Sequence, residues 1–328
     1  MVGMPIGEKR LIRRIQRMAG RGRAVVTGIG DDAAVLRIPA GHELLVTTDF
    51  TIEDVHFRRE WHSPQVVGWR CLTRGLSDIA AMGGEPLAVF LSLALPGDVP
   101  QQWVDGFLKG MMELASRHAL PLAGGDTAES KVGIQADIVV VGSVPKGRAV
   151  LRSKARPGEC IYVTGELGAP AMALDELRRG KLRAGKVLGA ESARHFRPEP
   201  RLAVGRWLRE RGIPSAMIDI SDGLSTDLEH ICEESHVGAE LELAAIPRAR
   251  CGMAKAQTVD LEYALHGGDE YELLFTSRRK VSASVEGVRV TAIGRTTTSP
   301  GMRLRDEKGK IVKLAARGWQ HFTDRVIG

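Results

Sequence analysis

Short acidic clusters, each set among glycines or other small residues, recur along this chain and constrain what it can fold into. Their carboxylates stand at expected strand ends and tight turns, and no His or Cys residues cluster with them. Oxygen ligands of this kind suit hard cations such as Mg²⁺, and Mg²⁺ in turn indicates phosphate chemistry. The five clusters are residues 28–32 (GIGDD), 47–49 (TTD), 76–78 (LSD), 124–127 (GGDT) and 219–223 (DISDG).

The length of 328 residues exceeds what one hydrophobic core usually serves, so we expect two domains of roughly 150 residues each. A turn at 145–148 (PKGR) follows a completed strand and is the candidate boundary, which gives domains 1–147 and 148–328. The net charge of +6 comes from Lys and Arg scattered in short groups. This scatter favours a solvated surface, and no nucleic-acid partner is expected.

The four cysteines, Cys71, Cys160, Cys232 and Cys251, form no C-x-x-C pair and fit free thiols in a reducing cytosol. The N-terminal segment has apolar residues at helical spacing between arginines, and it lacks the apolar core of a signal peptide. The longest apolar run, 87–95, is too short to span a bilayer. We therefore expect a cytoplasmic protein with no membrane partner.

Hydrophobic periodicity predicts helices and strands that do not follow a regular β-α-β order, which favours an α+β fold in both halves. The predicted helices are the N-terminal segment and residues 63–82, 101–118, 169–179, 200–211 and 226–234. The predicted strands are residues 43–50, 87–95, 121–123, 136–144, 160–164, 216–220, 271–276 and 289–293, with a hairpin turn at 306–309.

Two common phosphate-binding motifs are absent or poorly matched. No Gly-Lys pair is followed by Ser or Thr, so there is no Walker A loop. Gly28-x-Gly30-x-x-Ala33 matches the loose dinucleotide fingerprint, and Asp49 falls at the distance of a ribose contact. That fingerprint requires a helix to begin at the glycines, whereas residues 33–38 are short, β-compatible and followed by a proline.

Each cluster also has an ordinary structural interpretation. The aspartates of 28–32 can simply close a turn, and 124–127 either lets a backbone approach a ligand closely or forms a β-turn. A helix cap explains one carboxylate of 219–223 but leaves Asp219 unexplained. The paired acids of 267–270 can form a solvated turn, and Trp319 near the C-terminus can dock onto the core.

No Cys/His or Ser/His/Asp grouping indicates a covalent nucleophile, and no general base is expected. This fits phosphoryl transfer to an acceptor that is already ionised, because a phosphate monoester has a second pKa of about 6. Such a reaction needs charge neutralisation and in-line alignment, which several carboxylate-held Mg²⁺ ions can provide.

The clusters, together with His56 and the segment Gly267-Gly268-Asp269-Glu270, resemble the bacterial thiamine-monophosphate kinases in order and spacing over essentially the whole chain. That family belongs to the superfamily of aminoimidazole ribonucleotide synthetase, whose members bind ATP without a Walker A loop. The resemblance implies a two-domain α+β protein that dimerises through a β-barrel-like interface between its N-terminal domains. It also implies direct transfer of the γ-phosphoryl of ATP to thiamine monophosphate, which is the last step of thiamine diphosphate biosynthesis.

The resemblance further implies roles for individual residues. Aromatic Trp319 can stack on the cationic ring system of thiamine, and Arg152 can contact phosphate oxygens as a fork. Mg²⁺ ions would be held by Asp32, Thr47, Thr48, Asp49, Asp78, Asp126, Asp219 and Asp222. ATP would be contacted by Gly125, Asp126, Arg152 and Ser221, and thiamine monophosphate by His56, Asp269 and Trp319.

One departure from the family pattern and two rival functions stay open. The family usually has Gly-Gly-Glu-Asp where this chain has the reversed acids, so either Asp269 reaches the substrate or Glu270 replaces it. Another ATP-using member of the superfamily is the nearer rival, although selenophosphate synthetases would carry an N-terminal Cys and the hydrogenase-maturation dehydratase a C-terminal Cys. A non-enzymatic nucleotide- or nucleic-acid-binding protein would instead show binding that falls steeply with salt.

Overall fold

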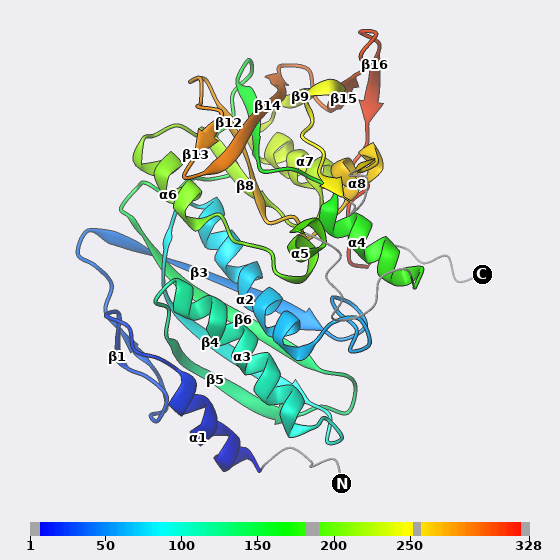
Figure 1. Ribbon diagram of the computed structural model, residues 1–328. Helices are drawn as coiled ribbons and strands as arrows, with labels where there is room; N and C mark the ends of the chain where they lie inside the picture. Colours follow the sequence, from blue (N-terminus) through cyan, green and yellow to red (C-terminus); the bar gives the residue numbers. More distant parts are fainter. Residues whose placement is uncertain (1–6, 181–189, 252–256, 323–328) are drawn as a thin grey trace. The chain divides into compact units, whose positions relative to one another are not determined.

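The computed structural model describes residues 7–180, 190–251 and 257–322, and the chain divides into two compact units (Figure 1). Unit 1 contains the described residues up to Ala149 except Ala80–Gly83, and unit 2 contains those four and the described residues from Val150 onward. Both units combine helices with a sheet, which confirms the predicted α+β class.

Unit 1 consists of α1 (Glu8–Met18), β1 (Val25–Thr27), β2 (Val35–Leu36), β3 (His42–Ile52), α2 (Pro64–Ala81), β4 (Glu85–Leu95), α3 (Gln101–Arg117), β5 (Leu122–Glu129) and β6 (Gln135–Pro145). Its main sheet has the order β3-β6-β4-β5, so β3 and β5 are the two edges. Only the β4–β5 pairing is parallel. Helices α2 and α3 cover one face of this sheet (Figure 1).

Helices α2 and α3 pack closely because a glycine stands at each contact. A Cβ atom on Gly68 would lie 1.9 Å from the carbonyl oxygen of Phe107, and one on Gly110 would lie 1.9 Å from that of Gln65. Beside these contacts Trp69 and Phe107 are fully buried. The two long helices predicted from periodicity therefore form the core layer of unit 1.

Strand β3 presents different chemistry on its two faces because successive side chains alternate. Thr47 and Asp49 contact side chains of α2. Leu44, Val46 and Phe50 point to the opposite face, where they are 46%, 61% and 57% exposed. We call these three residues the outer apolar face of β3.

Unit 2 is built on an eight-stranded sheet. Seven of its strands have the order β16-β15-β9-β14-β7-β12-β8, and the eighth, β13, pairs with β14. Apolar residues of β8 and α7, among them Ile218, Ile220, Leu224 and Leu228, share one buried core. The strands and helices are β7 (Cys160–Thr164), α4 (Ala169–Arg178), α5 (Ala190–Phe196), α6 (Leu202–Glu210), β8 (Ala216–Ile220), α7 (Leu224–Ser235), β9 (Gly238–Glu242), η1 (Leu243–Ala245), β10 (Arg250–Cys251), β11 (Gln257–Thr258), α8 (Leu261–His266), β12 (Glu272–Ser277), β13 (Ser284–Val285), β14 (Val288–Thr297), β15 (Met302–Arg305) and β16 (Ile311–Leu314).

Residues 124–127 do not form the β-turn that was one alternative, because they continue the strand β5. Gly125 pairs with Leu91 of β4, and a Cβ atom on Gly125 would lie 1.9 Å from the carbonyl oxygen of Leu91. Its φ of 149° also favours glycine. The glycines therefore allow two parallel strands to approach closely, and the predicted strand 121–123 extends to Glu129.

Candidate active site

The acidic loop 28–32 and the acidic part of β5 line one pocket in unit 1, with a volume of about 360 Å³. Asp31, Asp32 and Asp126 all border this pocket, and Ile12 and Ile15 of α1 form its apolar wall. The side-chain amide of Gln16 donates to the carbonyl oxygen of Ile29 at 2.8 Å, so α1 also holds the loop in place.

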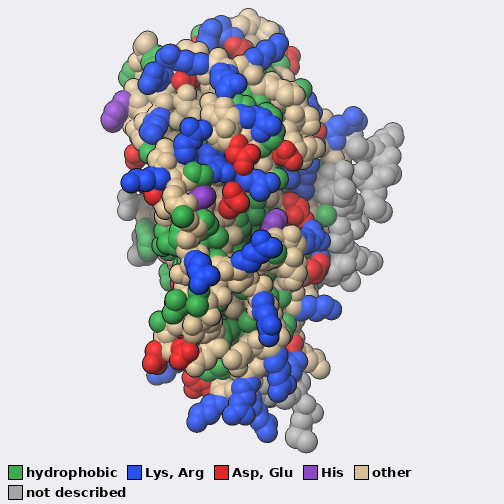
Figure 2. All heavy atoms as spheres, turned by 90° about the vertical axis from the view of Figure 1, so that its left-hand side faces the viewer, with side chains coloured by type: hydrophobic (Ala, Val, Ile, Leu, Met, Phe, Trp, Pro, Cys, Tyr) green, Lys and Arg blue, Asp and Glu red, His purple; other side chains and the backbone are tan. Residues whose placement is uncertain are grey.

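Helix α1 brings positive charge to the neighbourhood of this pocket. Lysine and arginine side chains gather at the lower end of the face shown in Figure 2, the end at which α1 lies. Lys9, Arg10, Arg13 and Arg17 of α1 are all exposed. Positive charge on α1 favours the approach of an anion such as a nucleotide.

A second polar group lies where β3 faces α2. The hydroxyl of Thr47 donates to the carboxylate of Asp78, and Arg74 pairs with Asp49 at 3.2 Å. Thr48 points to the other face of the sheet, where its hydroxyl donates to Asp137 at 2.6 Å. Of the predicted metal ligands, Thr47, Asp49 and Asp78 thus lie on the side of the sheet that faces α2. Thr48 faces the opposite side.

The two acidic groups of unit 1 lie at opposite edges of its sheet. Asp126 is opposite Ser92, Ser92 is opposite Asp137, and Asp137 is opposite Phe50 of β3. Three strand spacings separate them, which is ~14 Å. The predicted metal ligands of unit 1 therefore form two sets, an Asp32–Asp126 set and a Thr47–Asp49–Asp78 set.

His56 follows β3 in a loop that fixes its ring. The backbone N–H of Ile52 donates to Nδ1 of His56 at 3.0 Å, while the backbone N–H of His56 donates to the carbonyl oxygen of Ile52 at 2.8 Å. Since Nδ1 accepts a hydrogen bond, the neutral ring carries its proton on Nε2. Nε2 is then the donor that the side chain offers.

In unit 2 the cluster 219–223 forms a tight connection between β8 and α7. Asp219 is buried near the C-terminal end of β8, an edge strand of the sheet, and Ser221 and Asp222 are half-buried in the loop that follows. The backbone N–H groups of Ser221, Asp222 and Gly223 all donate to one carboxylate oxygen of Asp227, at 3.1, 3.2 and 3.0 Å.

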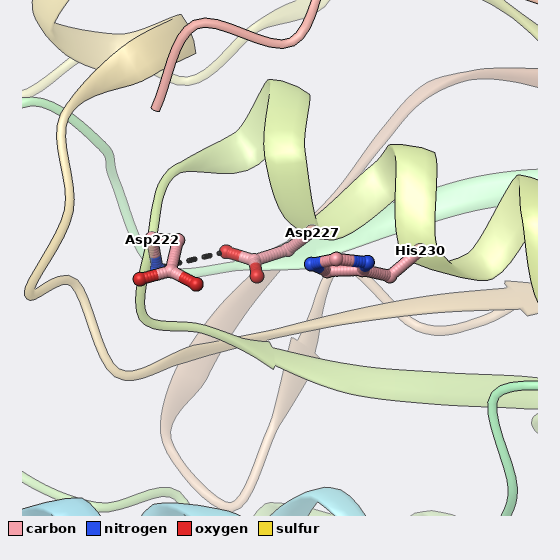
Figure 3. Close-up of side chains that lie close together, drawn as sticks. All are labelled: Asp222, Asp227 and His230. Carbon is pink, nitrogen blue, oxygen red and sulfur yellow. Dashed lines mark hydrogen bonds between the residues drawn. The ribbon is translucent and has the colours of Figure 1, made fainter. Parts of the chain in front are cut away.

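Asp227 is a site residue that the sequence analysis missed. Burial raises the pKa of Asp227 well above its usual value, and the carboxylates of Asp219 and Asp222 raise it further. Ligand atoms of Asp222, Asp227 and His230 lie within 4.8 Å of one another among the residues described, and Figure 3 shows the three side chains in a row along the start of α7. An acid within the first turns of a helix that follows an acidic loop was the available signal.

Residues 267–270 pack against the same loop. The backbone N–H of Asp269 donates to the carbonyl oxygen of Ser221 at 2.8 Å, and that of Tyr271 donates to Ile220 at 2.8 Å. Asp269 and Tyr271 both have positive φ, 64° and 53°, a strained conformation that clusters at functional sites. The Tyr271 hydroxyl donates to the half-buried carboxylate of Asp269 at 2.8 Å.

The two acids of this segment have different surroundings. Glu270 is buried and accepts a hydrogen bond from the backbone N–H of Gly168. Burial raises the pKa of Glu270 well above its usual value, although the Gly168 N–H and the charge of Arg194 oppose the rise. Asp269, which is half-buried, is thus the acid with accessible surface.

The C-terminal aromatic residue also lies at this loop. The backbone N–H of Trp319 donates to the carbonyl oxygen of Asp222 at 3.0 Å, and that of Gly318 donates to the hydroxyl of Thr226 at 3.0 Å. The side chain of Trp319 is 47% exposed, so its ring is not simply packed in the core. Ser221, Asp222, Asp269 and Trp319 are therefore brought together within unit 2.

Arg152 lies apart from that group within unit 2. Its carbonyl oxygen accepts from the hydroxyl of Ser235 at 2.7 Å, at the last residue of α7. Ser221 precedes the first residue of the same helix, so the twelve-residue length of α7 separates the two.

Comparisons with known proteins cover nearly the whole chain. Residues 30–144 match the family described as AIR synthase related protein, N-terminal domain, and residues 156–307 match its C-terminal domain. The thiamine-monophosphate kinase of Haemophilus influenzae is 35% identical over 334 residues, 98% of this chain and 99% of that protein.

Solved structures agree with these matches. The thiamine-monophosphate kinase of Stenotrophomonas maltophilia K279a is 34% identical with a TM-score of 0.79, covering 91% of this chain and 96% of that one. A structure of AaThiL complexed with AMPPCP and TMP is 31% identical with a TM-score of 0.76, covering 96% of this chain and 97% of that one. On this evidence the chain belongs to the thiamine-monophosphate kinase family of enzymes.

Proposed function

We propose that this chain transfers the γ-phosphoryl group of ATP directly to thiamine monophosphate, giving thiamine diphosphate as the last step of its biosynthesis. The observation that carries the proposal is the loop 221–223, because the backbone N–H of Asp269 donates to the carbonyl oxygen of Ser221 and that of Trp319 donates to the carbonyl oxygen of Asp222. A carboxylate for a cation and the contacts for an organic acceptor thus come from three segments that meet at this loop. The AMPPCP and TMP bound in AaThiL support the same pair of substrates.

The acidic residues fit Mg²⁺ as the cation. The carboxylates of Asp219 and Asp222 lie close enough to Asp227 to raise its pKa. A bound cation relieves the repulsion among these three carboxylates. The proposed ligands are Asp32, Thr47, Asp49, Asp78, Asp126, Asp219 and Asp222. Thr48, which the resemblance also implied, is left out because its hydroxyl faces Asp137 on the other side of the sheet. When bound, Mg²⁺ supplies neutralisation of the phosphate charges.

The proposed ATP contacts are Gly125 and Asp126 in unit 1 and Ser221 and Arg152 in unit 2. Gly125 and Asp126 are neighbours in the lining of the pocket, so their backbone and carboxylate groups border the space proposed for the phosphates. Arg152 is exposed and offers a planar fork of donors to phosphate oxygens.

The proposed contacts to thiamine monophosphate are Trp319, Asp269 and His56. The exposed ring of Trp319 can stack on a cationic ring, and the carboxylate of Asp269 can accept from an aminopyrimidine. Nε2–H of His56 can donate to an acceptor oxygen. The phosphate of the acceptor is already ionised, so the in-line attack needs no general base.

A homodimer formed through unit 1 is also part of the proposal. The outer apolar face of β3 is exposed, and both β3 and β5 have unpaired edges among the described strands. If β3 of one copy paired with β5 of another, two sheets would close into an eight-stranded barrel with no free edge. That pairing would also bring the Asp32–Asp126 set of one copy beside the Thr47–Asp49–Asp78 set of its partner.

A cytoplasmic location is proposed for this biosynthetic enzyme. Within the described ranges, no helix is long and apolar enough to cross a membrane. Burial raises the pKa values of Cys71 and Cys232 to about 12, which keeps these thiols protonated and unreactive at neutral pH.

The test is chromatographic detection of product from the purified full chain given ATP, Mg²⁺ and thiamine monophosphate. Thiamine diphosphate should form from the monophosphate but not from free thiamine, and EDTA should abolish it. Consumption of ATP with an aminoimidazole ribonucleotide precursor and no thiamine diphosphate would instead favour another activity of the superfamily. Nucleotide binding without turnover would favour a non-enzymatic role.

A further inference from the structure

Asp227 makes an unusual set of hydrogen bonds for a residue in the first turn of a helix. Its side chain is almost fully buried, and a single oxygen accepts from three consecutive backbone N–H groups, those of Ser221, Asp222 and Gly223. Figure 3 shows the carboxylate directed back from α7 toward Asp222. Three hydrogen bonds from consecutive N–H groups converge on one oxygen, so this side chain fixes the loop from its N–H side.

The carbonyl groups of the same loop are fixed by two other segments. The carbonyl oxygen of Ser221 accepts from the N–H of Asp269, and that of Asp222 accepts from the N–H of Trp319. These segments approach through glycine, because a Cβ atom on Gly268 would lie 2.6 Å from the Ser221 oxygen and one on Gly318 would lie 2.2 Å from the Asp222 oxygen. Each loop peptide is therefore held on both sides.

We propose that Asp227 is a positioning residue for the reaction, holding the loop so that Asp222 and the acceptor contacts Asp269 and Trp319 keep one arrangement. The proposal rests on the proposed function and assigns Asp227 a role through these neighbours, without contact to substrate. If the loop loses this hydrogen-bond acceptor, the carboxylate of Asp222 and both contacts to thiamine monophosphate lose their shared support. Metal use and acceptor use should then weaken together.

The decisive variant is Asp227→Asn, which keeps the size of the side chain and removes its charge. We expect the KM for thiamine monophosphate and the Mg²⁺ concentration for half-maximal activity each to rise ~10-fold or more, the range seen when a residue supporting a metal ligand is lost. A residue that only stabilised the fold would lower the melting temperature and leave both constants unchanged.

The matched control is Asp306→Asn. Asp306 also uses one carboxylate oxygen to accept two backbone N–H groups, those of Lys308 and Lys310 at 2.9 and 2.8 Å, in the hairpin between β15 and β16. The control has the same chemistry in the same unit, and the kinetic constants should equal those of the unaltered chain. If Asp227→Asn does not fold, Asp227→Glu keeps the charge but lengthens the side chain, and a several-fold rise in both constants is expected.

Binding of Mn²⁺, followed by electron paramagnetic resonance, separates this inference from the proposed function. Asp227→Asn should weaken Mn²⁺ binding to the full chain ~10-fold, whatever substrate the enzyme uses. If the unaltered chain makes no thiamine diphosphate, the proposed function falls and the Mn²⁺ titration still decides the role of Asp227. A folded Asp227 variant with unaltered Mn²⁺ affinity, or with unaltered KM and Mg²⁺ dependence in an active enzyme, would overturn the inference.

Discussion

Among single residues, a substitution of Asp219 should affect activity most directly. It is buried in β8 opposite Leu273, so Asp219→Asn changes its charge in a rigid strand without changing its volume. Loss of a metal ligand should cost more than loss of a residue that supports one, so thiamine diphosphate formation should fall by ~100-fold or more. Circular dichroism should show an intact fold, and a variant that kept Mg²⁺-dependent turnover would contradict the metal assignment.

Glu270 allows a prediction about pH. Because burial raises its pKa above the unfolded value of 4.5, the stability that it contributes is complete below pH 4.5 and is lost as pH rises through the folded pKa. Glu270→Gln removes this titration. The melting temperature of the variant should therefore rise relative to that of the unaltered chain as pH increases from 4.5 to 8. Each 1 kcal/mol of difference in the free energy of unfolding corresponds to ~2–4 °C. A difference independent of pH would show that Glu270 is ionised in the fold.

The residue pattern predicted which carboxylates to examine but not how each one is used. Spacing identified Asp219 and Asp222, and the backbone of Trp319 indeed meets Asp222. It did not distinguish Asp269 from Glu270, because the burial of Glu270 and its hydrogen bond from the Gly168 N–H decide that difference and require the folded chain. Asp227 was missed because a helical acid has the same local sequence whether its carboxylate faces solvent or turns back onto a loop.

At the scale of elements, the crossing of α2 and α3 depends on its glycines. A Cβ atom on Gly110 would lie 1.9 Å from the backbone of Gln65, so the two helices would have to separate. Gly110→Ala should destabilise unit 1 by ~1–3 kcal/mol, although alanine is the better helix former. Urea unfolding measures the change, with Lys109→Ala at the exposed neighbouring position as the control. Equal midpoints for the two variants would contradict this packing argument.

Elements with strong periodicity were predicted well, and elements that depend on distant partners were not. The helices α2 and α3 follow from apolar spacing within their own sequences. The prediction ended β5 before two glycines, because the reason for these glycines lies in β4: Gly124 faces the side chain of Phe90 and Gly125 faces the backbone of Leu91. Strand β9 was not predicted, since its short segment is stabilised by pairing with β14 and β15 from much later in the chain.

At the scale of the whole molecule, the outer apolar face of β3 predicts self-association. Val46 is 61% exposed at the middle of this face, and a charge there would be buried at a dimer interface. Light scattering should give about twice the chain mass of 35.6 kDa for the unaltered protein, and Val46→Lys should give the monomer mass. If the unaltered chain is itself monomeric at micromolar concentration, the proposed interface is wrong.

The separation of two acidic sets at opposite sheet edges leads to a sharper prediction for the dimer. Asp126→Asn should inactivate one set and Asp78→Asn the other, so each variant alone should be inactive. If every active site combines the two sets from different copies, a mixed dimer has one site with both substitutions and one with neither. Refolding the variants together at equal concentration should therefore restore about a quarter of the unaltered activity, since half of the dimers are mixed and one of their two sites works. Activity that stays absent after mass spectrometry has verified mixed dimers would mean that each chain carries both sets of its own site.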